Sequence, residues 1–383
     1  MIQIYSKLPG VGPSIFSVMT QMANEHRAIN LSQGFPDFDC APELLELVNQ
    51  SYRQGHHQYA PMPGLLSLRE QIAAKVNRLH GADYHPETEV TVTAGGTQAI
   101  FTAISAFIQP NDEVIIFEPA YDCYAPTVKA MGGIVKYMPL HPPDFAIDWA
   151  KVQKLTNGNT KMIIINSPHN PTGMVLGEED LKQLNKITRN TNILILSDEV
   201  YEHLIFDKHR HFSMAGFPEL KDRSLIVASF GKLFHTTGWK MGYCLAPEVL
   251  MKEFRKFHQF MVFSVHTPLQ HAIANYLKQK QDFSDLGLFF QEKRDFFRKL
   301  LSGSRFELMD CHGSYFQLLS YRNISEEADT VFAAKLVKEH GVASIPVSAF
   351  YSKNIDHQLL RFCFAKQEAT LEQAAEALMN VTH

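Results

Sequence analysis

Lys232 is the residue whose type and position most clearly suggest covalent chemistry. The apolar residues 224–230 before it predict a short buried strand, and the loop after it is rich in Gly and Thr. α/β sheets hold ligands beyond the carboxyl ends of their strands, and a partly desolvated lysine there keeps a neutral amine near pH 7. Such an amine can form a Schiff base with a carbonyl compound. A surface lysine between turn residues is the alternative, and this stretch alone does not decide between them.

An acid follows another apolar strand. Residues 192–201 predict a buried strand that ends at Asp198, with Tyr201 three residues further on. A buried carboxylate is costly unless it meets a positive partner. Asp198 therefore either pairs with a cationic ligand or caps the N-terminus of a helix.

A glycine loop suggests an anion site. Residues 90–93 predict a strand, and Gly95, Gly96 and Thr97 come between it and a predicted helix that ends at Phe107. Backbone N–H groups at a helix N-terminus bind anions, and glycines let a phosphate approach closely. Neither the G-x-G-x-x-G pattern nor the Walker pattern occurs, so a nucleotide site of those types is not indicated.

Two more polar residues lie at predicted strands: one follows a strand and the other lies inside one. Asn170 belongs to an N-P-T-G run after the strand 162–166, and by composition this run is a turn. Arg361 lies inside the apolar strand 359–364. A guanidinium binds a carboxylate with two hydrogen bonds of about 1.5–3 kcal/mol each. We therefore expect Arg361 to have an anionic partner.

The elements that position these residues alternate between strand and helix from residue 90 to 246, which predicts an α/β fold with a mainly parallel sheet between helices. We expect residues 46–280 to form a large domain and residues 281–383 a smaller C-terminal α+β domain. Residues 1–45 are expected to form an N-terminal arm and part of the small domain. An apolar stripe after residue 247 is expected to be core; it consists of Phe254, Phe257, Phe260, Met261 and Phe263.

Length and composition set further limits. The chain has 383 residues, of which 45% are hydrophobic, and a net charge of −4, so nothing favours a nucleic-acid partner or a membrane surface. Its five cysteines are dispersed without a C-x-x-C spacing, which fits reduced thiols better than disulfides or a zinc site. The N-terminus lacks the regions of a signal peptide. We expect a cytoplasmic protein without a metal site.

The run S-F-G-K-x-x-x-x-x-G-W-K over residues 229–240 resembles the cofactor-lysine motif of fold-type I pyridoxal-phosphate aminotransferases. Together with N-L-x-Q-G-F-P-D-F, N-P-T-G and D-E-x-Y, it is similar to the kynurenine/glutamine/methionine transaminase branch of class I, over residues 30–361. The resemblance implies a seven-stranded, mainly parallel sheet. One antiparallel strand is expected, and residues 241–246 are the candidate.

The resemblance also implies roles for single residues around pyridoxal phosphate. Lys232 holds the cofactor as an internal aldimine, Asp198 pairs with its ring nitrogen, and Tyr201 hydrogen-bonds its phenolic oxygen. The phosphate is expected to contact the residues Gly95, Gly96, Thr97, Ser229 and Lys240. Tyr121 is expected to stack on the ring. Asn170, Arg361 and the backbone of Gly34 are expected to hold the substrate carboxylate, and Asn170 also reaches the cofactor.

These expectations predict transamination between an amino acid and a 2-oxo acid in a ping-pong cycle. Methionine or an aromatic or glutamine-like amino acid is favoured, since no motif supplies a second arginine for a distal carboxylate, although Arg27, Arg53, Arg78 or Arg322 could do so. By resemblance, Tyr59 reaches the phosphate of a neighbouring subunit, which implies a homodimer. A C–S β-lyase on the same fold is the alternative, and a non-enzymatic regulator that keeps the fold is more remote.

Overall fold

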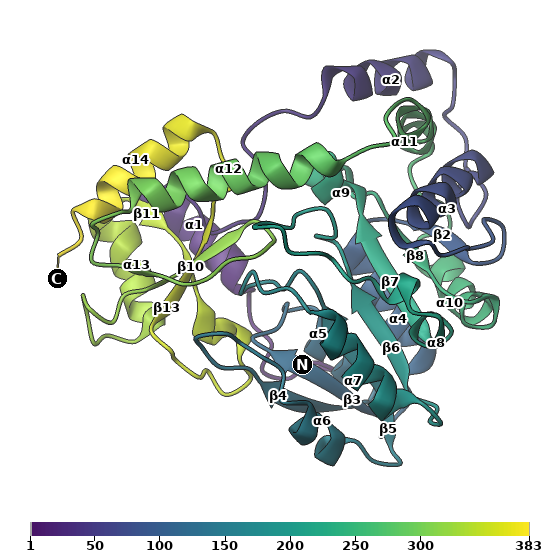
Figure 1. Ribbon diagram of the computed structural model, residues 1–383, viewed down its shortest axis with the longest axis horizontal. Helices are drawn as coiled ribbons and strands as arrows, with labels where there is room; N and C mark the ends of the chain where they lie inside the picture. The colour runs from purple at the N-terminus through teal and green to yellow at the C-terminus, as the bar shows by residue number, and fades with distance from the viewer. Residues whose placement is uncertain (1, 383) are drawn as a thin grey trace.

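The computed structural model describes residues 2–382, and a seven-stranded sheet forms its larger half (Figure 1). The strand order is β2-β8-β7-β6-β5-β3-β4, and every pair is parallel except those that β8 makes with β2 and β7. The predicted mainly parallel sheet with one antiparallel strand is therefore confirmed. Its strands are β2 (Val90–Thr93), β3 (Glu113–Glu118), β4 (Ile134–Pro139), β5 (Thr160–Asn166), β6 (Leu194–Asp198), β7 (Ser224–Ser229) and β8 (Gly242–Leu245).

Helices cover both faces of this sheet because its central strands are apolar on both sides. Along β3, Val114 and Ile116 pack with α4, whereas Ile115 and Phe117 face the core on the opposite side. The helices of this half are α2 (Pro42–Arg53), α3 (Leu66–His80), α4 (Gly96–Phe107), α5 (Tyr124–Ala130), α6 (Trp149–Leu155), α7 (Glu178–Thr188), α8 (Pro218–Lys221), α9 (Phe230–Leu233), α10 (Glu248–Met261) and α11 (Thr267–Gln279). Within residues 2–382, no helix is both long and apolar enough to cross a membrane.

The smaller half is built on a four-stranded antiparallel sheet of order β12-β13-β10-β9. Its strands are β9 (Glu307–Leu308), β10 (Phe316–Ser320), β12 (Ile345–Pro346) and β13 (Leu359–Cys363), and its helices are α12 (Ser284–Leu300), α13 (Asp329–His340) and α14 (Glu368–Met379). From the other end of the chain, α1 (Ile15–His26) packs on α13, and β1 (Ile29–Asn30) pairs with β11 (Val342–Ala343). Residues 15–30 thus pack with the small half, and the predicted division of the chain into domains stays a prediction.

The apolar stripe on and after α10 is not core, so this prediction was wrong for most of its residues. Met251, Phe254 and His258 face inward at helical spacing, which turns the intervening positions outward. Phe254 is buried, whereas Phe260 is 88% and Phe263 is 56% exposed. Phe257 and Met261 are also exposed.

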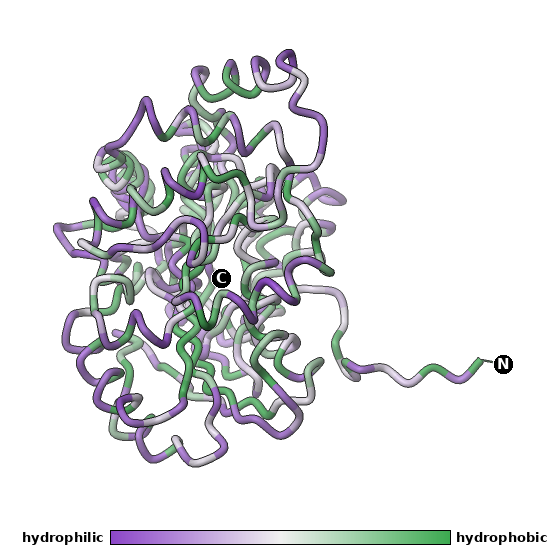
Figure 2. The backbone as a smooth tube through the Cα atoms, turned by 90° about the vertical axis from the view of Figure 1, so that its right-hand side faces the viewer, coloured by the Kyte–Doolittle hydropathy of each residue, from purple (hydrophilic) through white to green (hydrophobic). Residues whose placement is uncertain are grey.

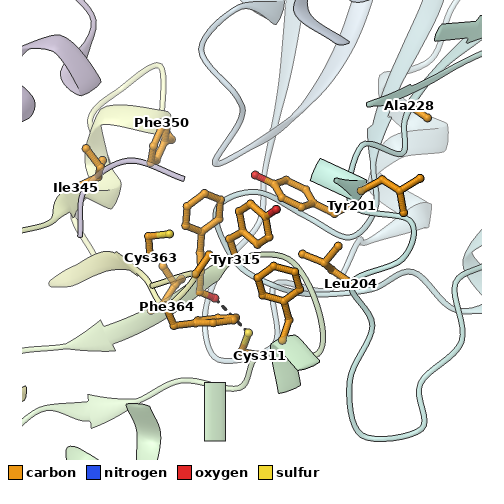
Figure 3. Close-up of a cluster of buried hydrophobic side chains, with 14 of the residues drawn as sticks. Tyr201, Leu204, Ala228, Cys311, Tyr315, Ile345, Phe350, Cys363 and Phe364 are labelled. Carbon is orange, nitrogen blue, oxygen red and sulfur yellow. Dashed lines mark hydrogen bonds between the residues drawn. The ribbon is translucent and has the colours of Figure 1, made fainter. Parts of the chain in front are cut away.

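A buried cluster joins the two halves beside the carboxyl ends of the large sheet's strands (Figure 3). Tyr201 follows β6 in the large half, and its ring lies 5.4 Å from that of Tyr315, which precedes β10 in the small half. The Tyr315 hydroxyl donates a hydrogen bond of 3.0 Å to the backbone carbonyl of Lys232. This core therefore sets the position of Lys232 relative to the small sheet.

Candidate active site

A cavity of about 360 Å³ lies where the two halves meet. Every residue that the sequence predicted for the site lines this cavity, with the exception of Tyr59. The lining residues among them are Gly34, Gly95, Gly96, Thr97, Tyr121, Asn170, Asp198, Tyr201, Ser229, Lys232, Lys240 and Arg361. Segments separated by more than three hundred residues in the sequence are thus brought to one place.

Lys232 lies in α9, a single turn that begins directly after β7. Its Nζ donates a hydrogen bond of 2.8 Å to the carbonyl oxygen of Gly34 and lies 4.9 Å from the ring centre of Tyr315 and 5.2 Å from that of Tyr201. Burial lowers the pKa of Lys232 to about 8. About a tenth of this amine is therefore neutral at pH 7, and the neutral form is the one that acts as a nucleophile or base.

Asp198 is the last residue of β6 and is only 4% exposed. The hydroxyl of Tyr124 donates to its Oδ2 at 2.5 Å, and the backbone N–H of Val200 donates to Oδ1 at 3.3 Å. Burial raises the pKa of Asp198 to about 6, against these two hydrogen bonds, which lower it. A cation placed in the cavity beside Asp198 would stabilise the carboxylate.

The N-terminus of α4 and Lys240 form the positive end of the cavity. Gly95 precedes the helix with φ of +82°, a conformation that glycine adopts without strain. A Cβ at Gly95 would lie 3.5 Å from Nζ of Lys240, so the lysine reaches over the helix start. Thr97 Oγ1 lies 3.2 Å from the hydroxyl of Tyr121. Free helix N–H groups, the helix dipole and an ammonium together suit a phosphate.

Arg361 projects from β13 and is fully buried. One terminal nitrogen donates to Asn170 Oδ1 at 2.7 Å, and the other donates to the carbonyl oxygen of Ser32 at 2.7 Å. Burial lowers the pKa of Arg361 to about 10, so it stays charged at neutral pH. Within residues 2–382, no carboxylate lies within 4 Å of it. A ligand carboxylate would satisfy this charge.

Gly34 and Asn170 are placed by close contacts. A Cβ at Gly34 would lie 2.5 Å from the ring of Phe316, so no larger residue fits without displacement. The backbone N–H of Asn170 donates to Asn166 Oδ1 at 2.8 Å, which fixes the N-P-T-G turn. The same Phe316 ring lies 3.8 Å from the guanidinium carbon of Arg361.

Tyr59 lies outside the cavity. Its side chain is 81% exposed, and its ring packs edge-on against Phe263 at 5.1 Å. Phe263 has a left-handed backbone with φ of 64°. In a single protomer, Tyr59 therefore contacts no other residue of the predicted site.

Several residues at the site were not predicted from the sequence. Tyr124 lies three residues after Tyr121, but the sequence gives no sign that its hydroxyl reaches Asp198. The sequence also gives no sign of Tyr315 and Phe316, which contact Lys232 and Arg361 respectively. Phe16 lines the cavity from α1, the first helix of the chain.

Comparison with known proteins assigns the family. Residues 26–378 match the model for aminotransferase class I and II. The chain is 46% identical to the methionine aminotransferase of Escherichia coli over 97% of each chain, and 32% identical to kynurenine–oxoglutarate transaminase 1 of Rattus norvegicus over 97% of this chain and 96% of the relative. The crystal structure of YbdL from Escherichia coli, described as having a methionine aminotransferase function, matches with a TM-score of 0.96 at 45% identity and covers 99% of this chain and 100% of its own. The protein therefore belongs to the class I and II aminotransferases, a pyridoxal-phosphate-dependent family of transaminases.

Proposed function

We propose that this aminotransferase binds pyridoxal phosphate in the cavity and takes methionine, or an aromatic or glutamine-like amino acid, as its amino donor. The observation that carries the proposal is that Lys232, Asp198 and Arg361 converge on one cavity although they come from α9, β6 and β13. An amine, an acid and a carboxylate-binding guanidinium are the three groups that transamination of an α-amino acid requires.

The residues of the cavity fit pyridoxal phosphate. The amine of Lys232 would bind its aldehyde carbon, and the carboxylate of Asp198 would hold a proton on its ring nitrogen. Its phosphate would lie at the N-terminus of α4, beside Lys240 and Ser229. When bound, the cofactor supplies a ring that withdraws electrons from the substrate's Cα.

Other side chains fit the ring of pyridoxal phosphate. Tyr121 would cover one of its faces, and Tyr201 and Asn170 would donate hydrogen bonds to its phenolic oxygen. These three residues line the same cavity as Lys232.

The protein's own side chains would orient the amino acid and move its proton. Arg361, Asn170 and the backbone of Gly34 would hold the α-carboxylate, which would keep the amino acid's Cα beside Lys232. With a pKa of about 8, the Lys232 amine is suited to take a proton from Cα as a general base and then to donate that proton to another atom as a general acid.

The cavity lining favours a donor whose side chain is uncharged. Within residues 2–382, its only charged lining residues are Asp198, Lys232, Lys240 and Arg361, all of which already have roles. None of the arginines considered for a distal carboxylate lines it; these are Arg27, Arg53, Arg78 and Arg322. Phe16, Phe35 and Phe316 supply apolar surface instead, which suits a thioether or an aromatic ring. The 46% identity to a methionine aminotransferase supports the same preference.

A spectroscopic half-reaction tests the proposal. The purified protein with pyridoxal phosphate is mixed with methionine in the absence of a keto acid, and its visible spectrum and products are recorded. We expect conversion to pyridoxamine phosphate with one keto acid per active site. Lys232→Ala should fold and bind the cofactor weakly but should not turn over, and substantial residual transamination by this variant would contradict the assignment of Lys232.

Specificity constants for methionine, phenylalanine, glutamine and aspartate test the substrate class. A clear preference for aspartate would reject the substrate proposal while leaving the cofactor proposal intact. Pyruvate or α-ketobutyrate released together with ammonia from cystathionine-like substrates would favour the C–S β-lyase instead.

We further propose that the protein is a homodimer in which Tyr59 of each protomer reaches the phosphate site of the other. The exposed ring of Tyr59 packs against the exposed ring of Phe263, and Phe260, three residues before Phe263, is also exposed. Exposed apolar surface of this kind is typical of interaction sites. The N-terminal residues also extend away from the body of the protein (Figure 2), with the side chains of Ile4 and Tyr5 exposed. Sedimentation analysis should give a dimer for the wild-type protein and a shift toward monomer for Phe260→Glu. A monomeric wild-type protein with full activity would refute this proposal.

A further inference from the structure

Residues 32–35 form a backbone strap, without helix or strand, at the edge of the cavity. Three cations donate hydrogen bonds to its carbonyl oxygens: Arg361 to Ser32 at 2.7 Å, Lys232 to Gly34 at 2.8 Å and Lys366 to Phe35 at 2.8 Å. The strap is thus held by positive charges at three of its carbonyl oxygens.

Lys366 is the unusual member of this set. It follows β13, is only 2% exposed, and has no carboxylate within 4 Å among residues 2–382. Among residues 2–382, the one hydrogen bond of its Nζ goes to the Phe35 carbonyl, and the centre of the Phe35 ring lies 4.0 Å away. Lysines are almost never fully buried without an ionic partner, because an ammonium loses its hydration there. The proposed reaction does not use this charge.

The other two cations have competing duties in the proposed function, on which this inference rests. Lys232 and Arg361 line the cavity and would turn toward the cofactor and the substrate carboxylate, whereas Lys366 does not line it. Once both have turned, Lys366 is the remaining cation on the strap. At the far end, Asp37 accepts hydrogen bonds from the backbone of Gln367 and the hydroxyl of Thr370, so the chain just after Lys366 fixes that end too.

We propose that Lys366 is a positioning residue that keeps the strap, and with it Gly34, in place while Lys232 and Arg361 are engaged with ligands. The buried ammonium is then retained for substrate binding and not for stability. Replacing Lys366 by an apolar residue removes the cost of burying an ammonium but leaves the Phe35 carbonyl without its donor, so the two effects on stability oppose each other.

The test uses Lys366→Met in the holoenzyme, because methionine keeps an unbranched apolar stem as far as Cε and lacks the ammonium. We expect KM for methionine to rise by about tenfold, equivalent to about 1.4 kcal/mol of binding free energy. The value of kcat, the cofactor absorbance and Tm should stay close to those of the wild type. Hydrogen–deuterium exchange of the peptide that covers residues 30–38 should accelerate when methionine is added, and more than in the wild type.

Lys221→Met is the matched control. Lys221 also donates to one carbonyl, that of Asp83, and lies over one ring, that of Tyr84 at 4.5 Å, but it is not among the residues that line the cavity. This variant should leave KM and the exchange of residues 30–38 unchanged.

Unchanged KM and unchanged exchange in Lys366→Met would overturn the proposal. So would a variant that fails to fold, because the ammonium would then serve the fold. Absence of transamination in the wild-type protein would reject the proposed function instead, and the exchange measurement on the strap would still stand.

Discussion

Tyr124→Phe isolates the hydrogen bond that sets the acidity of Asp198. In the wild type, the Tyr124 hydroxyl donates to Oδ2 at 2.5 Å, and the only other hydrogen bond to this carboxylate among residues 2–382 is that from Val200 at 3.3 Å. The phenyl ring of the variant fills the same space and removes the donor alone. The carboxylate is then buried with one weak partner, so its pKa should rise.

The size of this rise follows from the strength of the lost bond. A hydrogen bond to a charged group contributes about 1.5–3 kcal/mol, which corresponds to roughly 1–2 pKa units. The pKa of Asp198 in the cofactor-free protein is about 6. It should therefore move to roughly 7–8 in Tyr124→Phe. Since the neutral acid cannot pair with a protonated ring nitrogen, the affinity for pyridoxal phosphate should begin to fall at a correspondingly higher pH.

The assay is the dissociation constant of pyridoxal phosphate from the cofactor-free protein between pH 5 and pH 9 for both proteins. Tyr351→Phe serves as the control, because it also removes a buried hydroxyl, one that donates to the Leu140 carbonyl at 2.7 Å, far from Asp198. We expect the acid limb to shift only in Tyr124→Phe. Superimposable profiles for all three proteins would refute the assignment of Tyr124.

Three further changes test the site. Asp198→Asn should raise Tm of the cofactor-free protein at pH 8 and weaken cofactor binding. The pKa of Asp198 is raised from 3.8 to about 6 in the folded state, so its ionisation lowers the free energy of unfolding by about 3 kcal/mol above pH 6 and not at all below pH 4. Equal Tm values at pH 8 would show that this burial cost is absent. Gly34→Ala should raise KM and lower the free energy of unfolding by about 1–3 kcal/mol, since its Cβ would meet Phe316 at 2.5 Å; unaltered kinetics would mean that the strap yields freely. Arg361→Lys should raise KM for methionine roughly tenfold to a hundredfold through the loss of one charged hydrogen bond, with the cofactor spectrum preserved; a changed spectrum would instead place Arg361 at the cofactor.

Most of the fold could be predicted because local pattern and tertiary structure agree. The apolar runs that end at Asn166, Asp198 and Ser229 became neighbouring parallel strands, so the loops after them had to meet at one edge of the sheet. The resemblance to the aminotransferases then indicated which side chain in each loop to choose.

The features that could not be predicted are the directions in which single side chains point and whether an apolar helix face is buried or exposed. The hydroxyl of Tyr124 and the ammonium of Lys366 each donate one hydrogen bond, to Asp198 and to the Phe35 carbonyl, and no spacing in the sequence predicts either contact. The rings of Phe257 and Phe260 were assigned to the core because an apolar stripe usually is core, whereas an exposed stripe has the same sequence pattern.

The pairing of β1 with β11, in which Ile29 lies opposite Val342, has a consequence for the order in which the protein can be made. On the ribosome, the strands of the large sheet, residues 90–245, emerge before any of the four-stranded sheet. The N-terminal strand must wait for a partner that is translated near the end of the chain. Lys232 is thus synthesised long before Arg361, and the cavity that needs both can close only after translation is nearly complete. A nascent chain truncated before β11 should therefore form the large sheet without a complete substrate site.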